Sequence, residues 1–274
     1  MRTLEAIFMK AFSISLCAAL VLTGAICVPA FGGEKGRGRD AASAPDVEFA
    51  REGARRGIRP SGLTPGFPKD AGCPEIASGY ASPTRYDGSA RPATRFGGVH
   101  GGMDITLDEG TPLLAIASGK VIALGVGGQA EGIYVWLQHA PRDSGLPFWV
   151  YSKYQHLVAL PGLKPGDILK AGDKLGLAGR TGTVGGHYGA SGYSHLHLTT
   201  FAGSSDRYQQ DGSRIVAEGA RMIDPLTMFV AGLGGIDDIE VLSDSQRNVA
   251  ISHVGADGTI RPAGSRVVWP VACR

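Results

Sequence analysis

Residues 97–105, "GGVHGGMDI", place a histidine and an aspartate four positions apart, at His100 and Asp104. Gly101 and Gly102 between them argue against a helix, because glycine is among the poorest helix formers. We therefore expect a strand that leaves a loop, in which both side chains can converge on one point. Taken alone, a solvated aspartate and a histidine in a turn would be the simpler interpretation.

A second histidine pair lies in "SHLHL", residues 194–198, at His195 and His197. Side chains alternate along a strand, so both imidazoles would share one face. That is a poor arrangement for a core, because each ring needs a polar partner. Chance histidines on an exposed edge strand are the alternative. Added to His100 and Asp104, His197 would complete two neutral nitrogens and one carboxylate, a set suited to catalytic zinc with one position left for water.

Two further histidines stand in strand-like runs. His156 follows Tyr154 in "YSKYQHL", and His139 lies in "YVWLQHA". Alone, each is expected to be structural. For His139 a place in the core or at a sheet edge is favoured, with support of the metal ligands from behind as the alternative.

The glycine content of the chain and the spacing of its β-prone runs predict a mainly β fold. The chain holds 42 glycines without a Gly-X-Y period, which indicates many tight turns. From about residue 76, short β-prone runs alternate with turn residues at intervals of about ten, typical of an antiparallel β-sandwich or open barrel. Only residues 221–233 have helical character, and Pro225 limits this to a turn or a short helix.

Charge and the N-terminus bear on location. Lys and Arg total 27 against 25 for Asp and Glu, so the basic field that nucleic-acid binding needs is absent. Residues 1–30 combine early basic residues, an apolar run and a small-residue cleavage site, which predicts a signal peptide and export to the periplasm or cell envelope. An uncleaved single-pass anchor is the alternative.

Export bears on the cysteines. Cys17 and Cys27 would leave with the signal, so Cys73 and Cys273 would remain together in an oxidising compartment. We expect a disulfide between them, with two free thiols as the alternative.

Composition divides the rest of the chain. Residues 31–75 mix Gly, Pro and charge without a period, which predicts a poorly structured N-terminal extension or linker with one short helix over residues 46–57. Residues 76–230 carry the domain. Residues 231–274 form a short C-terminal extension with two expected strands, in "RNVAISHV" and "SRVVWPVACR".

Three motifs in order now support a resemblance. His100-x-Gly102-x-Asp104, Tyr154-x-His156-Leu157 and His195-x-His197 resemble the signature of the lysostaphin-type (LytM-like) zinc endopeptidases of bacterial cell walls. Two segments between these motifs also resemble the family: "GTPLLAIASGKVIALG" resembles its strand pair after the aspartate, and "LKPGDILKAGDKLGLAGRTG" resembles its hairpin before the histidine pair. The resemblance covers residues 76–230 and implies the LytM fold, also called the duplicated hybrid motif.

The resemblance also implies roles. One zinc ion per chain would be held by His100, Asp104 and His197. His156 and His195 would be catalytic without binding the metal, one taking the proton of the attacking water and the other stabilising the oxyanion or protonating the leaving amine. Tyr154 and His139 are the candidates to support the ligands from behind.

The implied substrate is peptidoglycan, cleaved in its peptide stems or cross-links. The sequence does not choose between glycine bridges and direct cross-links, and a periplasmic D,D-endopeptidase is favoured. The main alternative is a non-catalytic LytM-like regulator that activates other cell-wall hydrolases, although all five expected positions are filled. A carrier-like barrel is a weaker alternative, because the chain lacks a Met-Lys-Met attachment hairpin. The sequence predicts no oligomeric state.

Overall fold

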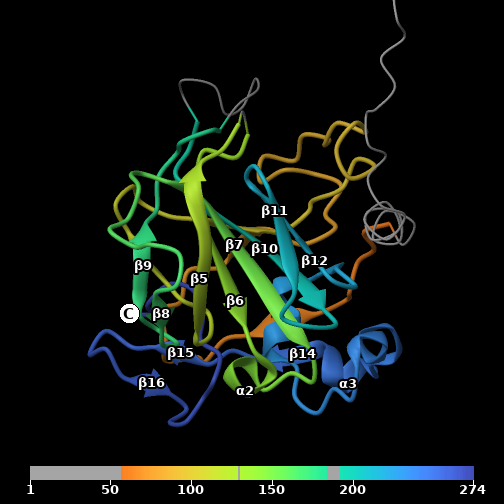
Figure 1. The fold of residues 1–274 in the computed structure, drawn as a ribbon. Helices are drawn as coiled ribbons and strands as arrows, with labels where there is room; N and C mark the ends of the chain where they lie inside the picture. Colours follow the sequence, from red (N-terminus) through yellow and green to blue (C-terminus); the bar gives the residue numbers. More distant parts are fainter. Residues whose placement is uncertain (1–56, 129, 184–191) are drawn as a thin grey trace, which may run out of the picture. The chain divides into compact units, whose positions relative to one another are not determined.

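A computed structural model describes residues 57–128, 130–183 and 192–274 (Figure 1). The expected signal peptide, residues 1–30, and most of the helix expected over residues 46–57 lie outside the described residues. Within the described ranges, no helix has both the length and the apolar character needed to cross a bilayer.

An eight-stranded antiparallel sheet dominates the described part of the chain, as predicted for a mainly β fold. Its order is β2-β3-β10-β7-β6-β5-β8, with β13 also paired to β10. Figure 1 shows the long strands β5, β6, β7 and β10 side by side. The strands are β2 (Ile76–Ser78), β3 (Met103–Thr106), β5 (Gly119–Val126), β6 (Ile133–His139), β7 (Trp149–Leu157), β8 (Ile168–Leu169), β10 (His195–Gly203) and β13 (Arg221–Ile223).

Short elements surround this sheet. Four two-stranded pairs are β1 (Thr64–Gly66) with β14 (Asn248–Ala250), β4 (Pro112–Leu114) with β9 (Lys174–Leu177), β11 (Tyr208–Asp211) with β12 (Arg214–Ala217), and β15 (His253–Val254) with β16 (Ile260–Arg261). The described helices are one or two turns long: α2 (Pro141–Ser144), η1 (Pro225–Phe229), η2 (Ile236–Val241) and α3 (Asp244–Arg247). Helix η1 begins at Pro225 as expected, and the Asp224 side chain caps it by accepting the Leu226 amide.

Alternation along β10 divides the two faces of the main sheet. Leu196 and Leu198 are fully buried in the principal hydrophobic core. Their neighbours on the strand, His195 and His197, line a pocket on the opposite face. This is the period of two expected for a strand. The same strand therefore anchors the core and presents the histidine pair.

The segments on either side of the predicted domain also enter the core. β1 pairs with β14, which joins residues 64–66 to the C-terminal segment. Trp269 is fully buried, packs its ring edge-on against Phe67 at 5.0 Å, and donates from Nε1 to Pro74 O at 2.9 Å. The structure also joins Cys73 to Cys273 in a disulfide, the pairing expected from the sequence.

One expected strand of the C-terminal segment is corrected. "RNVAISHV" contains β14 and β15, but "SRVVWPVACR" makes only an isolated bridge between Val267 and Ala117. The reason lies in its hydrogen bonds. The Val268 amide donates to Ile116 O, but the next residue that faces this segment is Pro270, which has no amide hydrogen, so the ladder does not continue.

Candidate metal centre

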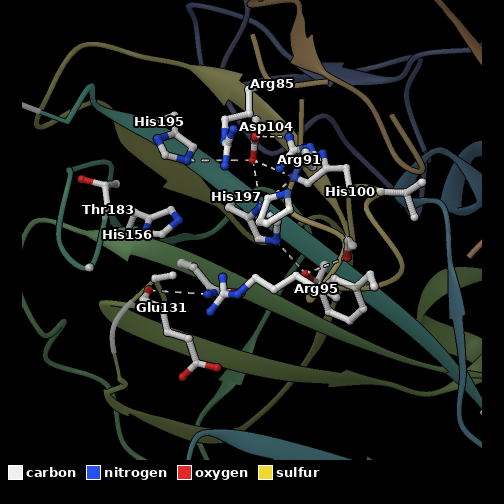
Figure 2. Close-up of a pocket in the computed structure, with 18 of the residues that line it drawn as sticks. Arg85, Arg91, Arg95, His100, Asp104, Glu131, His156, Thr183, His195 and His197 are labelled. Atoms are coloured by element: carbon white, nitrogen blue, oxygen red, sulfur yellow. Dashed lines mark hydrogen bonds and ion pairs between the residues drawn. The ribbon is translucent and has the colours of Figure 1, made fainter. Parts of the chain in front are cut away.

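Three side chains converge at the junction of β3 and β10. Asp104 lies on β3, His197 lies opposite it on β10, and His100 precedes β3 in the chain. Their potential ligand atoms lie within 4.8 Å of one another. His197 Nδ1 is 2.8 Å from Asp104 Oδ1. His100 Nε2 is 3.1 Å from His197 Nδ1 and 3.2 Å from Asp104 Oδ1. Figure 2 shows the three groups facing one another.

Glycine is required at one position for this convergence. A Cβ added at Gly102 would lie 2.5 Å from Leu198 O and 2.8 Å from His197 Nε2, closer than real Cβ atoms approach. The absent side chain lets β3 approach β10 directly beneath the His197 ring. The glycine-rich setting noticed in the sequence thus has a packing reason at Gly102.

Hydrogen bonds on the outer sides orient both imidazoles. His100 Nδ1 lies 3.0 Å from Gly79 O, a carbonyl that can only accept. His197 Nε2 lies 2.9 Å from Thr199 Oγ1, whose hydroxyl donates to Gly101 O at 3.2 Å. With its outer nitrogen donating in this way, each ring would present its inner lone pair to a bound metal, as metal-binding histidines do.

Thr199 was not among the residues identified from the sequence. The signal was present, because Thr199 follows His197 by two positions and so shares its face of β10. What the sequence did not show is which atom the hydroxyl would meet.

Electrostatics keep the three groups ready to bind a cation. Burial raises the pKa of Asp104, but the charge of His100 and hydrogen bonds from both histidines outweigh it and hold that pKa well below its usual range. Burial lowers the pKa of His197 to about 4. At neutral pH the carboxylate is thus charged and His197 is neutral. Arg91 Nη2 lies 3.5 Å from the other carboxylate oxygen, Asp104 Oδ2.

His156 reaches the same pocket through an unusual backbone conformation. Its neighbour Gln155 pairs with His197 on the pocket face of the sheet, so strict alternation would send His156 to the opposite face. Instead His156 has φ of 67°, in the left-handed region that side chains other than glycine rarely adopt. The register of β6 with β7 also shifts between Ile133 and Val135, opposite this point. The local bend directs the ring into the pocket.

Thr181 holds this bend. Its carbonyl oxygen lies 2.8 Å from His156 Nδ1 and accepts the ring proton, which leaves the His156 Nε2 lone pair free to accept another. Its hydroxyl donates to Leu157 O at 2.6 Å and accepts the Ile133 amide at 2.9 Å. Thr181 therefore ties β6 and β7 together where the bend occurs. No sequence motif indicated this role, because the effect of Thr181 runs largely through backbone atoms.

His195 lies between His156 and the three converging groups. Its ring centroid is 4.5 Å from that of His156, and its Nε2 is 3.9 Å from Asp104 Oδ1. His195 Nδ1 is 3.1 Å from Tyr193 O, and the Tyr193 ring stacks on the imidazole at 4.4 Å. Burial lowers the pKa of His195 and lowers that of His156 to about 3, so both rings are neutral at neutral pH.

The two candidates to support the ligands from behind make their contacts elsewhere, and for His139 this is the core placement that the sequence favoured. Tyr154 lies on the core face of β7, and its hydroxyl accepts the Ile116 amide at 2.8 Å. His139 is fully buried at the end of β6, with ring nitrogens at 2.8 Å from Ser118 O and 2.7 Å from Ser152 Oγ. Neither residue lines the pocket. Tyr154 faces the core because it precedes Gln155, which faces the pocket, and side chains alternate along a strand. His139 is away from the pocket because it lies at the last position of β6.

The converging groups open into a pocket of about 790 Å³. His156 and His195 line it beside His100, Asp104 and His197 (Figure 2). The loop before His100 forms another wall. The five residues that the sequence motifs singled out are therefore brought together in one pocket.

The donor set fits a zinc ion. Zinc in catalytic sites takes histidine nitrogens and carboxylate oxygens at about 2.0–2.1 Å in tetrahedral geometry, which sets neighbouring donors about 3.3 Å apart. The three donor separations here, 2.8 to 3.2 Å, are close to that value. Three protein donors would leave the fourth position toward the pocket.

Comparison with known proteins agrees with this geometry. Peptidase family M23 matches residues 98–207, which contain the three converging groups, His156 and His195. An uncharacterized metalloprotease of Buchnera aphidicola subsp. Baizongia pistaciae is 34% identical over 116 residues, which are 42% of this chain and 26% of that protein. Lysostaphin of Staphylococcus staphylolyticus is 33% identical over 108 residues, 39% of this chain and 20% of lysostaphin.

This chain thus matches about a quarter of the length of the first relative and a fifth of the second. Among solved structures, lysostaphin from Staphylococcus simulans is 26% identical with a TM-score of 0.40, over 60% of this chain and 54% of that one.

Proposed function

We propose that this chain is a zinc-dependent endopeptidase that hydrolyses peptide bonds in the stems or cross-links of peptidoglycan, a proposal supported by the match of peptidase family M23 to residues 98–207. The observation that carries the proposal is the convergence of His100 Nε2, Asp104 Oδ1 and His197 Nδ1 beside two neutral imidazoles. A merely structural cluster would have no need of two more proton acceptors in an open pocket.

Each residue then has a part in hydrolysis. Zinc bound to His100, Asp104 and His197 would supply a Lewis acid that polarises the scissile carbonyl and acidifies water. His156 Nε2, whose ring is fixed by the Thr181 carbonyl, accepts the proton of the attacking water. The proton taken from water then passes to the leaving amine. His195, whose Nε2 lies 3.9 Å from Asp104 Oδ1, would in its protonated form donate a hydrogen bond to the developing oxyanion.

The proposal includes export to the cell envelope. The apolar, cleavable pattern of residues 1–30 supports it. The disulfide between Cys73 and Cys273 also supports an oxidising compartment, because such bonds are rare in the cytosol. The mass of the protein recovered from the envelope tests this step: cleavage near residue 30 is expected, and an intact N-terminus would favour the anchor.

Digestion of purified peptidoglycan tests the activity itself. The exported protein, loaded with one equivalent of zinc, is incubated with peptidoglycan sacculi, and the released fragments are analysed by mass spectrometry with labelling of new amines. New amine ends are expected, and their identity names the bond cleaved. The control is the same preparation stripped of metal by a chelator and then reloaded. A folded, zinc-loaded protein that releases nothing would contradict the proposal and favour the regulator.

A further inference from the structure

The pocket beside the candidate metal centre has a strongly cationic wall. The loop before His100 lines it with Arg85, Arg91 and Arg95. Among the described lining residues, the only carboxylates are Asp104 and Glu131. A wall of this kind favours an anionic group on whatever enters the pocket.

Neither carboxylate of the pocket neutralises this wall fully. Asp104 is one of the three converging groups and would bind the metal. Glu131 Oε1 pairs with Lys153 Nζ at 3.3 Å, and its other oxygen accepts the Ser213 hydroxyl. Glu131 is therefore compensated by a lysine of its own side of the pocket.

The three arginines differ in their contacts. Arg91 has structural contacts, because it donates to Ser78 Oγ at 2.8 Å and Thr84 O at 3.1 Å and lies near Asp104. Arg85 donates to Ala90 O at 2.7 Å within its own loop. Arg95 is exposed, and its guanidinium has no hydrogen-bond or ion-pair partner within residues 57–128, 130–183 and 192–274.

The side chain of Arg95 extends into the pocket. Figure 2 shows its side chain extending across the pocket from the loop toward Glu131, past His197. The guanidinium thus lies in the same pocket as the candidate metal centre. A guanidinium offers two parallel N–H groups that match the two oxygens of a carboxylate.

We infer that the pocket recognises a free carboxylate carried by the peptide substrate beside the scissile bond, and that Arg95 is the residue that binds it. The inference rests on the proposed function, because the metal centre defines where the scissile bond lies. The inference distinguishes the two kinds of substrate between which the sequence did not choose, glycine bridges and direct cross-links. Peptides with an acidic residue next to the cleaved bond are accepted, and uncharged glycine bridges are discriminated against.

Binding of matched peptides to zinc-loaded protein tests the inference. His156→Ala serves as the background, since it should bind peptide without cleaving it. One peptide pair carries a terminal α-carboxylate or its carboxamide after the scissile bond. A second pair carries a side-chain carboxylate or its carboxamide there, which separates the two sources of the charge. Calorimetry then gives each dissociation constant.

At least one carboxylate peptide is expected to bind about tenfold or more tightly than its carboxamide, the effect of one charged hydrogen-bonded pair. Adding Arg95→Gln should bring the ratio to about one, and Arg95→Lys should leave an intermediate ratio because charge remains without the fork. Arg142→Gln is the matched control. It removes the same charge from a side chain that is 87% exposed and lies outside the pocket, so the ratio should persist.

Equal binding of acid and amide, or a preference that survives Arg95→Gln, would overturn the inference. Failure of the proposed function is a separate result. Digestion of peptidoglycan by the unsubstituted protein without carboxylate preference would remove only the inference. A carboxylate preference without any digestion would contradict the endopeptidase and leave Arg95 as a residue that binds the carboxylate of a peptide.

Discussion

Among the described residues, two clusters bring the potential ligand atoms of three side chains within 4.8 Å of one another, and one of the two has the character of a metal centre. The first cluster is His100, Asp104 and His197, and the second is Cys73, His253 and Cys273. In the first cluster the atoms converge without bonding covalently and line an open pocket. In the second the two sulfurs are joined in a disulfide.

The difference lies in what the outer atoms do. In the first cluster, Gly79 O and Thr199 Oγ1 lie within hydrogen-bond distance of the outer ring nitrogens, which leaves the inner nitrogens to bind a metal. In the second, His253 Nδ1 is buried without a hydrogen-bond partner among the described residues, and the sulfurs are bonded to each other and are no longer thiolate donors. Residue types and proximity therefore do not define a metal site; the atoms that hold the protons do.

The largest effect is expected from removing a ligand of the first cluster. His197→Ala leaves two donors, so zinc affinity should fall by more than about 100-fold, beyond the range for losing a supporting hydrogen bond. Activity should be lost with the metal. Zinc per chain after dialysis, measured by plasma mass spectrometry, checks this. Full retention of zinc would show that the ion is held elsewhere and would erase the contrast between the clusters.

Removing His156 separates binding from turnover. His156→Ala should keep zinc, because the ring is not one of the three converging donors, yet lower kcat by about 10²–10⁴-fold as proton transfer is lost. Cleavage rates and zinc content measured on the same preparation check this. His253→Ala is the matched control, since it removes a buried imidazole of the second cluster and should leave both quantities unchanged. A zinc-free His156→Ala protein would place His156 among the ligands.

Breaking the second cluster should cost stability and leave the metal in place. Cys73→Ala with Cys273→Ala opens a bond that spans 200 residues, and the free energy of unfolding should fall by roughly 2–5 kcal/mol. Chemical denaturation measures the loss. Zinc content should stay at one per chain in the folded variant. A parallel loss of zinc at low denaturant would mean that the two clusters depend on each other.

The sequence predicted the members of the first cluster well, for a physical reason. Ligand types and strand alternation are local properties, so the residue pattern identified His100, Asp104 and the His195–His197 pair as candidates. That they belong to one site was implied by the resemblance to the lysostaphin-type endopeptidases. The antiparallel architecture and the short helix at Pro225 follow from equally local signals.

Features that depend on tertiary contacts were not predictable in this way. His156 enters the pocket only because its backbone is left-handed, and the sequence favoured a regular strand there. Tyr154 stands two positions before it and lies in the core instead. Trp269 lies in a strand-like pattern, but its ring fills the core and its amide donates to Ser252 O outside any ladder. In each case a partner distant in sequence decides the outcome.

The smallest expected effect concerns the hydrogen bond behind His197. Thr199→Val keeps the shape of the side chain and removes the acceptor for His197 Nε2, so the ring loses what fixes its tautomer. Zinc affinity should fall by about 10–100-fold while the fold persists. Competition with a fluorescent zinc chelator measures the affinity.

Thr200→Val is the matched control, because Thr200 is the next residue of the same strand and is fully buried, and its hydroxyl donates to Ile223 O at 2.8 Å, away from the centre. This variant should cost stability of about 1 kcal/mol and leave zinc affinity unchanged. Equal effects of the two variants on zinc would mean that β10 acts as a rigid whole. Unequal effects would locate the difference between the two clusters in a single acceptor atom.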